Sequence, residues 1–186
     1  MKYLKDFILH KNIFSKSLCD DIITAYQSEM FDRDNHHNKT TRHLGEIDIS
    51  NHDVIDTKNS YVRKKIEVSV FDFIKSLIQT YTEYVHPYNF QVHQDIGYFL
   101  RQMRKGDYYK EHDDDGIGEG TGTRRMTVSI CLNEDYVGGD FTFFQEQEIY
   151  SLQKGDVLMF PSSFMYPHGV KEITEGTRYQ LITWLR

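Results

Sequence analysis

The chain has 186 residues, a formal net charge of −6 and two cysteines. This length predicts a single domain over residues 1–186 that buries its core without disulfides or a structural metal. The negative charge gives no general attraction to nucleic acid or to anionic membranes, so we expect neither as a partner.

The cellular compartment is predicted from the cysteines and the N-terminus. Cys19 and Cys131 are far apart and have no metal-site spacing, which is typical of a reducing compartment. The first residues lack the apolar segment and cleavage site of a signal peptide, and no apolar stretch is long enough to cross a bilayer. We therefore expect a cytoplasmic protein, and the sequence leaves its oligomeric state open.

The N-terminal half predicts two helices. The first begins within Phe14–Ile23, where Ser15 or Ser17 can cap free amide groups and acidic residues in the first turn would favour the helix dipole. The second ends before Pro87 and has one apolar face, with residues three or four positions apart. This face consists of Val62, Ile66, Val70, Ile74, Leu77, Tyr81 and Val85.

Between these helices lies a polar stretch, residues 31–59, which predicts a long loop of the kind that forms a lid or is mobile. Its histidines are His36, His37, His43 and His52. We interpret them as solvated loop residues in preference to a second metal site.

After Pro87 the pattern changes to short strand-like runs separated by turn residues. These runs are Gly97–Met103, Arg125–Leu132, Phe141–Phe144, Val157–Phe160 and Arg178–Leu185. Helices followed by strands predict an α+β fold, with helical support at about 14–86 and an antiparallel jelly-roll core at about 90–186.

The segment Gly116–Gly122 has glycine at every second position but lacks the Lys-Ser/Thr pair of a phosphate-binding loop. We interpret it as a flexible loop beside the site described next, able to close over a substrate.

One candidate metal site stands out. His112 and Asp114 are two residues apart, so in a β-strand both side chains would point to the same face. His168 would reach them from a later strand on the opposing sheet. Two histidines and one carboxylate leave three coordination positions open, which suits a non-haem Fe(II) that activates oxygen. A single His-x-Asp pattern is also common by chance, and the alternative is a solvated acidic turn.

Arg178 follows His168 by ten residues, on a predicted strand whose same face carries Gln180, Ile182 and Trp184. A buried arginine there needs an anionic partner, which a dicarboxylate cosubstrate would supply through a bidentate pair. The alternative is a structural ion pair with a protein carboxylate.

With these elements in order, the chain resembles the Fe(II)- and 2-oxoglutarate-dependent oxygenases, in their prolyl 4-hydroxylase-like branch, over roughly residues 95–186. The resemblance also rests on Arg125–Glu134, which looks like the family strand ending in Leu-Asn, on the Gly-Gly-acidic hairpin at Gly138–Phe143, and on Lys154–Phe160 before the distal histidine. It implies a double-stranded β-helix.

The same resemblance implies the cofactors and their ligands. His112, Asp114 and His168 would hold Fe(II) and form the catalytic centre, while Arg178 would fix the far carboxylate of 2-oxoglutarate. Ascorbate is an accessory reductant that the resemblance also suggests.

Two positions depart from the family pattern. Family members often carry tyrosines near 2-oxoglutarate where this chain has Gln102 or Met103, and Cys131. Nearby candidates to replace them are Tyr98, Tyr108 and Tyr109, and the sequence does not decide among them.

By parity, one strand face carries Thr127, Ser129 and Cys131 and another carries Phe141 and Phe143. These faces either line the cosubstrate pocket or belong to the sandwich core.

The expected activity is hydroxylation of a C–H bond, with a prolyl residue in a peptide or protein as the preferred substrate. One alternative is a hydroxylase of a free amino acid or small metabolite. Others are a non-catalytic jelly-roll binding module and a different metal enzyme on the related cupin architecture. Nucleic-acid repair by the same chemistry is disfavoured by the acidic balance.

Overall fold

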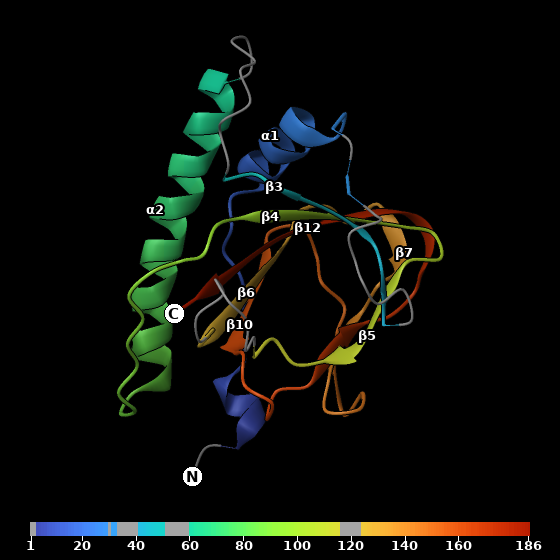
Figure 1. Ribbon diagram of the computed structural model, residues 1–186. Coiled ribbons are helices and arrows are strands. Elements are labelled where there is room, and N and C mark those ends of the chain that lie inside the picture. Colours follow the sequence, from blue (N-terminus) through green and yellow to red (C-terminus); the bar gives the residue numbers. More distant parts are fainter. Residues whose placement is uncertain (1–2, 30, 33–40, 51–59, 116–123) are drawn as a thin grey trace.

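A computed structural model describes residues 3–29, 31–32, 41–50, 60–115 and 124–186 of the chain (Figure 1). The predicted loop at Gly116–Gly122 lies outside these residues, as do His36, His37 and His52 of the polar stretch.

Three helices are present in this part of the chain. They are the 3₁₀ helix η1 (Leu4–Phe7) and the α-helices α1 (Lys16–Tyr26) and α2 (Ser60–Val85). Ser15 caps α1, since its Oγ accepts a hydrogen bond from the Leu18 amide at 3.3 Å. The expected acidic first turn is wrong, because Asp20 and Asp21 come after that turn.

The apolar face predicted for α2 is confirmed. Six of its seven residues are buried, and Val62, near the start of the helix, is 47% exposed. The helix ends at Val85, two residues before Pro87, whose ring cannot continue it. The Tyr81 hydroxyl donates a hydrogen bond to the Phe7 carbonyl at 2.8 Å and ties α2 to the N-terminal segment.

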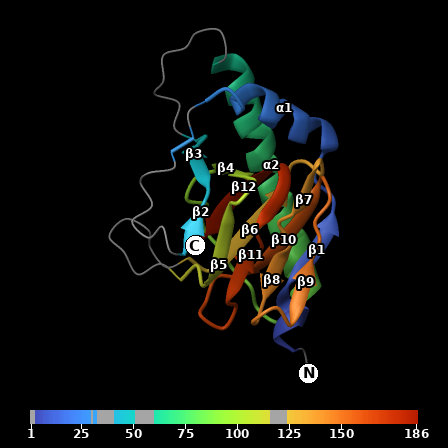
Figure 2. The same ribbon diagram turned by 90° about the vertical axis from the view of Figure 1, so that its right-hand side faces the viewer.

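The strands form two antiparallel sheets. The seven-stranded sheet has the order β1 (Leu9–Asn12), β10 (Asp156–Pro161), β6 (Met126–Cys131), β12 (Ile173–Leu185), β4 (Phe99–Arg104) and β3 (Gly45–Asp48), with β7 (Tyr136–Gly138) also paired to β12. The five-stranded sheet has the order β2 (Arg42–His43), β5 (Tyr108–His112), β11 (His168–Val170), β8 (Phe141–Phe143) and β9 (Glu148–Tyr150). Figure 2 shows the strands of this second sheet side by side.

The helices and the two sheets form layers. Apolar residues of α1 and α2 pack against one face of the seven-stranded sheet, through a cluster shared with β1, β4, β6, β10 and β12. In Figure 1, α2 runs along one side of these strands and β5 lies on the other side. A second, aromatic-rich cluster joins the two sheets and includes Phe141, Phe143 and Phe160. The predicted α+β jelly roll braced by N-terminal helices is confirmed.

Some expectations about the elements need correction. The polar stretch 31–59 is not one loop, because β2 and β3 form within it and each pairs with a strand of the core. Strand β12 begins at Ile173, five residues before the predicted start. No helix in the described ranges has the length and hydropathy needed to cross a bilayer.

Strand register fixes which side chains of β12 face the interior of the jelly roll. Arg178 lies opposite Met103, Gln180 opposite Cys131, Ile182 opposite Ser129 and Trp184 opposite Thr127. Directly opposed residues of an antiparallel pair share a face. The alternating face predicted for this strand is therefore confirmed, and it faces the second sheet.

Candidate metal centre and anion pocket

The structure brings His112, Asp114 and His168 together, with one ligand atom from each residue within 4.8 Å of the others. His112 Nε2 lies 3.6 Å from Asp114 Oδ1, and His168 Nε2 lies 3.3 Å from Asp114 Oδ2. The two histidines are register partners on the adjacent strands β5 and β11. The expectation that His168 comes from the opposing sheet is therefore wrong: it lies beside His112 in the same sheet.

Asp114 reaches this cluster in an unexpected way. It lies two residues beyond the end of β5, so strand alternation does not place its carboxylate. Its amide donates to the Ser162 carbonyl at 3.2 Å, and the Thr127 hydroxyl donates to its Oδ2 at 2.7 Å. Thr127 lies on β6, and Ser162 directly follows β10. The carboxylate is thus fixed from the seven-stranded sheet, while both imidazoles come from the five-stranded sheet.

Both imidazoles are oriented by main-chain carbonyls. His112 Nδ1 lies 2.8 Å from the Lys110 carbonyl, and His168 Nδ1 lies 3.0 Å from the Tyr166 carbonyl. A carbonyl can only accept, so each Nδ1 carries the proton and each Nε2 presents a lone pair to the cluster. His112 Nε2 is buried and has no hydrogen-bond partner among the residues that the structure describes. A buried nitrogen in this state is the form in which histidine binds a metal ion.

The electrostatics favour a neutral His112 and an ionised Asp114. Burial, together with the neighbouring His168, lowers the pKa of His112, which keeps its imidazole neutral. Burial alone would raise the pKa of Asp114, but His168 and His112 hold that pKa well below its usual range. Two neutral imidazoles and one carboxylate fit a divalent metal of the Fe(II) type, with positions left for other ligands.

Aromatic rings surround the two histidines. Tyr109 stacks on the His112 ring, with centroids 3.6 Å apart and an interplanar angle of 11°. Phe141 stacks on His168 at 5.5 Å, and Phe160 meets the same ring edge-on at 4.8 Å. These rings restrict how the imidazoles can rotate and give the cluster apolar walls.

Arg178 is completely buried, with an exposed fraction of 0%. Its Nη1 donates to Gln180 Oε1 and lies 3.7 Å from Met103 Sδ, while its Nε and Nη2 are buried and have no hydrogen-bond partner in the described part of the chain. The structural ion pair considered as an alternative is not seen among the described residues. A buried cation without an anion is costly, so this geometry indicates an anionic ligand.

Polar side chains connect the buried arginine with β6. Gln180 Nε2 donates to Ser129 Oγ, and Thr127, on the same face of β6, donates to the Asp114 carboxylate. All three side chains are buried. This face of β6 therefore holds polar groups that contact both the metal cluster and the neighbour of Arg178, which a purely apolar sandwich core would not need.

The tyrosines proposed as replacements near Arg178 lie elsewhere. Tyr98 donates to Asp95, Tyr109 stacks on His112, and Tyr108 lines the outer groove described below. The tyrosine next to Arg178 is instead Tyr136 of β7, whose ring centroid lies 6.0 Å from the guanidinium carbon.

Sequence reasoning missed Tyr136. The available signal was its position two residues before the Gly138-Gly139 pair, where the chain leaves β7, which pairs with β12, for β8 of the other sheet. A side chain at Gly139 would collide with Ile173 at 2.4 Å and approach the Arg178 side chain at 3.1 Å, so glycine lets this crossing segment pack so closely.

Two hydrogen-bond donors near the metal cluster lack a partner in the described part of the chain. One belongs to Trp184, which shares a face of β12 with Arg178. The Arg124 guanidinium stacks over the Trp184 ring at 3.8 Å, and among the described residues the buried Nε of Arg124 and Nε1 of Trp184 have no partner. Arg101, 5.6 Å from the same ring, donates to Glu46 at 2.6 Å. Trp184 is the register partner of Thr127, whose hydroxyl donates to Asp114, which places these donors near the candidate metal ligands.

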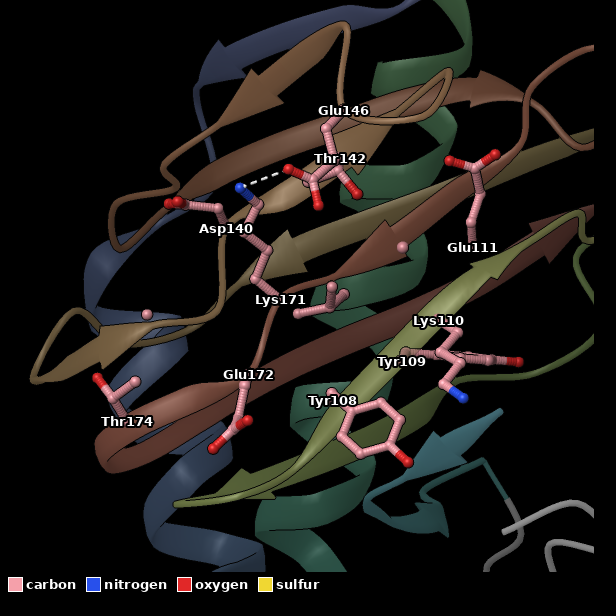
Figure 3. Close-up of a pocket in the computed structure, with 13 residues that line it drawn as sticks. Tyr108, Tyr109, Lys110, Glu111, Asp140, Thr142, Glu146, Lys171, Glu172 and Thr174 are labelled. Atoms are coloured by element: carbon pink, nitrogen blue, oxygen red, sulfur yellow. Dashed lines mark ion pairs between the residues drawn. The ribbon is translucent and has the colours of Figure 1, made fainter. Parts of the chain in front are cut away.

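A separate groove of about 730 Å³ lies over the five-stranded sheet (Figure 3). Its labelled side chains include Tyr108, Lys110 and Lys171, and Lys171 pairs with Glu146 at 2.9 Å. Gly169 forms part of its floor, since any side chain there would meet the Tyr109 carbonyl at 2.8 Å. His168 and the other members of the metal cluster are not among the residues that line this groove.

Comparison with known proteins extends these observations. Residues 98–186 match the family model described as the 2OG-Fe(II) oxygenase superfamily. A PKHD-type hydroxylase of Idiomarina loihiensis is 29% identical over 90 residues, which cover 47% of this chain and 40% of that protein. A PKHD-type hydroxylase of Prochlorococcus marinus is 24% identical over 89 residues, again 47% of this chain and 39% of the relative. The similarity thus spans less than half the length of these curated relatives.

Solved structures with the same fold cover nearly the whole chain. A prolyl hydroxylase from Trichoplax adhaerens, in complex with a hypoxia inducible factor peptide fragment, superposes with a TM-score of 0.70 at 17% identity, over 97% of this chain and 83% of that one. A Pseudomonas putida prolyl-4-hydroxylase gives a TM-score of 0.68 at 15% identity, over 96% and 91%. At these identities the likeness shows the fold, the double-stranded β-helix.

Proposed function

We propose that the chain, whose residues 98–186 match the model of the 2OG-Fe(II) oxygenase superfamily, is an Fe(II)- and 2-oxoglutarate-dependent hydroxylase of a prolyl residue in a peptide or protein. One observation carries the proposal. A three-residue cluster of metal-ligand type and a fully buried arginine without a described anionic partner belong to the same jelly-roll interior.

Each residue has a defined role in this proposal. His112 Nε2, His168 Nε2 and the Asp114 carboxylate would hold Fe(II), and Arg178 would bind the far carboxylate of 2-oxoglutarate. When bound, iron, 2-oxoglutarate and O₂ together supply the oxidative decarboxylation that hydroxylates a C–H bond. Thr127 keeps the Asp114 carboxylate in place, and the aromatic walls exclude water from the cluster.

The donors near the metal cluster support a substrate rich in hydrogen-bond acceptors. Arg124 Nε and Trp184 Nε1 are both buried N–H groups for which the described ranges offer no partner. A prolyl residue within a peptide has no backbone N–H, and it and its neighbours offer carbonyl oxygens. A peptide segment would therefore satisfy both donors. The Trichoplax prolyl hydroxylase, which is in complex with a peptide fragment, supports this substrate class.

A second candidate is hydroxylation of a free amino acid or small metabolite. The observation that favours it is the pair of guanidinium groups, Arg101 and Arg124, that both lie beside Trp184. Arginine is well suited to hold the carboxylate of a small acid. The pairing of Arg101 with Glu46 reduces the positive charge available for this, so we place the peptide substrate first.

The cofactors can be tested before the substrate is known. Purified apoprotein is titrated without oxygen, first with Fe(II) and then with 2-oxoglutarate, while the weak visible charge-transfer band of the chelate is recorded. We expect the band in the wild type and in His93→Ala, which removes an exposed histidine outside the cluster, and its loss in His112→Ala. A folded wild-type protein that takes up iron but gives no band would favour a binding module or another cupin-like metal enzyme.

The substrate class is then tested by succinate release. Proline-containing peptides are compared with free proline and other free amino acids at equal concentration, with and without ascorbate. Faster succinate formation with peptides, together with a mass increase of one oxygen on proline, is the expected result. Turnover with free amino acids alone would establish the second candidate instead.

A further inference from the structure

We propose that the phenol of Tyr136 is a second donor, beside Arg178, to the far carboxylate of 2-oxoglutarate. This inference rests on the proposed function and assigns a role to a residue outside the positions where the family pattern places tyrosine. Those positions hold Gln102 or Met103, and Cys131 here. Gln102 Nε2 donates to the Tyr179 hydroxyl, and Met103 is the one of the two that lies opposite Arg178; neither Met103 nor Cys131 can donate a strong hydrogen bond.

The position of the Tyr136 hydroxyl supports this role. It lies 3.4 Å from the Sγ atom of Cys131, so it occupies the space into which a larger side chain at position 131 would extend. The ring lies beside the Arg178 guanidinium, whose carbon is 6.0 Å from the ring centroid. A tyrosine at 131 would collide with Tyr136, and the small cysteine leaves it room.

The hydrogen-bond partners of Tyr136 and Arg178 support the same role. Within the described residues, the Tyr136 hydroxyl lies 3.4 Å from both Cys131 Sγ and the Leu152 carbonyl, and the Arg178 guanidinium also lies within its reach. The distance to the carbonyl is well beyond the optimum of about 2.7–2.8 Å for an O–H donor, and sulfur is a weak acceptor, so the proton is held weakly. Arg178 likewise has two N–H sites, Nε and Nη2, without a partner. One carboxylate with two oxygens would satisfy donors from both residues.

The protonation state of Tyr136 also suits a donor. Burial raises the pKa of its phenol to about 12, although the nearby Arg178 acts in the opposite direction. The phenol therefore keeps its proton at neutral pH and offers it to an anion. Met103 Sδ lies 3.7 Å from Nη1 of Arg178, the other proposed donor. A thioether sulfur is a weak acceptor, so Met103 does not compete with a carboxylate for this N–H group.

The test compares two ligands and three proteins. 2-Oxoglutarate and 2-oxopentanoate differ only in the far group, which is a carboxylate in the first and a methyl group in the second. Dissociation constants are measured by anaerobic titration of the Fe(II)-loaded wild type, Tyr136→Phe and Tyr150→Phe. The last variant removes the hydroxyl of another partly buried tyrosine packed on the same cluster. Thermal melts verify that each variant is folded.

We expect Tyr136→Phe to weaken 2-oxoglutarate binding about 10- to 100-fold, the range for losing a hydrogen bond to a charged group, and to leave 2-oxopentanoate binding unchanged. Tyr150→Phe should bind both ligands as the wild type does. Unchanged 2-oxoglutarate affinity in Tyr136→Phe would overturn the inference, and an equal loss for both ligands would assign the phenol a purely structural role. A wild type that binds neither keto acid would instead refute the proposed function itself.

Discussion

Thr127 is the position where a single hydroxyl group is expected to control the candidate metal centre. Its Oγ1 lies 2.7 Å from Asp114 Oδ2 and 2.9 Å from Ser162 Oγ. A carboxylate only accepts, so the Thr127 proton goes to Asp114 and Ser162 donates to Thr127. Thr127→Val keeps the shape but removes this donor. A hydrogen bond to a charged group contributes about 1.5–3 kcal/mol, which corresponds to an affinity change of about 10- to 100-fold.

The measurement is anaerobic calorimetric titration of the apoprotein with Fe(II). We expect Thr127→Val to bind iron about 10- to 100-fold more weakly, as is typical when a residue that orients a metal ligand is lost. Thr127→Ser retains the hydroxyl and should bind nearly as well as the wild type. Thr183→Val is the matched control, because Thr183 is also buried but its hydroxyl has no partner. Wild-type affinity in Thr127→Val would refute the role assigned to this hydrogen bond.

Three further substitutions test the packing. Gly169→Ala would place a Cβ 2.8 Å from the Tyr109 carbonyl and should cost about 1–3 kcal/mol of unfolding free energy; an unchanged melting temperature would contradict this. Thr183→Val removes a buried hydroxyl that has no hydrogen-bond partner among the described residues, and should raise the unfolding free energy by about 1 kcal/mol in urea denaturation. A lower unfolding free energy would show that the hydroxyl makes a stabilising hydrogen bond. Burial alone would raise the pKa of Asp156, but a backbone amide and Asn12 donate to the carboxylate and lower it. The ionised carboxylate therefore stabilises the fold above the ordinary carboxyl pKa of about 3.9, and this contribution is lost as the pH falls through the lower pKa of the folded state. Asp156→Asn should lower the unfolding free energy at pH about 7 and lower it by less at pH about 3. A difference from the wild type that is the same at both pH values would contradict this.

The sequence predicted the parts of the site that depend on local periodicity. The alternation of β12 correctly placed Arg178, Gln180 and Trp184 on one face, because a strand has a fixed period of two. The apolar stripe of α2 was equally readable, since its residues recur at helical spacing along one buried face. The hairpin predicted at Gly138–Phe143 is wrong, because β7 pairs with β12 and β8 pairs with β11 and β9, so the two glycines connect the two sheets.

What the sequence could not supply depends on contacts between distant segments. The order of the strands, which puts β11 beside β5, is set by long-range pairing, so His168 was assigned to the wrong sheet. Asp114 was explained by strand alternation, although Thr127 and Ser162 hold it from the other sheet. Tyr136 reaches Arg178 only because β7 pairs with β12, a contact with no periodic signal in the sequence.

The division of the metal ligands between the two sheets leads to a last prediction. His112 and His168 belong to the five-stranded sheet, and Asp114 is fixed by residues of the seven-stranded sheet, so a bound ion would link both. An ion at about 100 times its dissociation constant adds about 2.7 kcal/mol to the unfolding free energy. For a chain of this size that corresponds to a rise in melting temperature of about 5–10 °C. Redox-inert Mn(II), compared with chelator, should give this rise in the wild type and in His93→Ala but not in His112→Ala. An equal rise in His112→Ala would mean that the stabilising ion binds elsewhere.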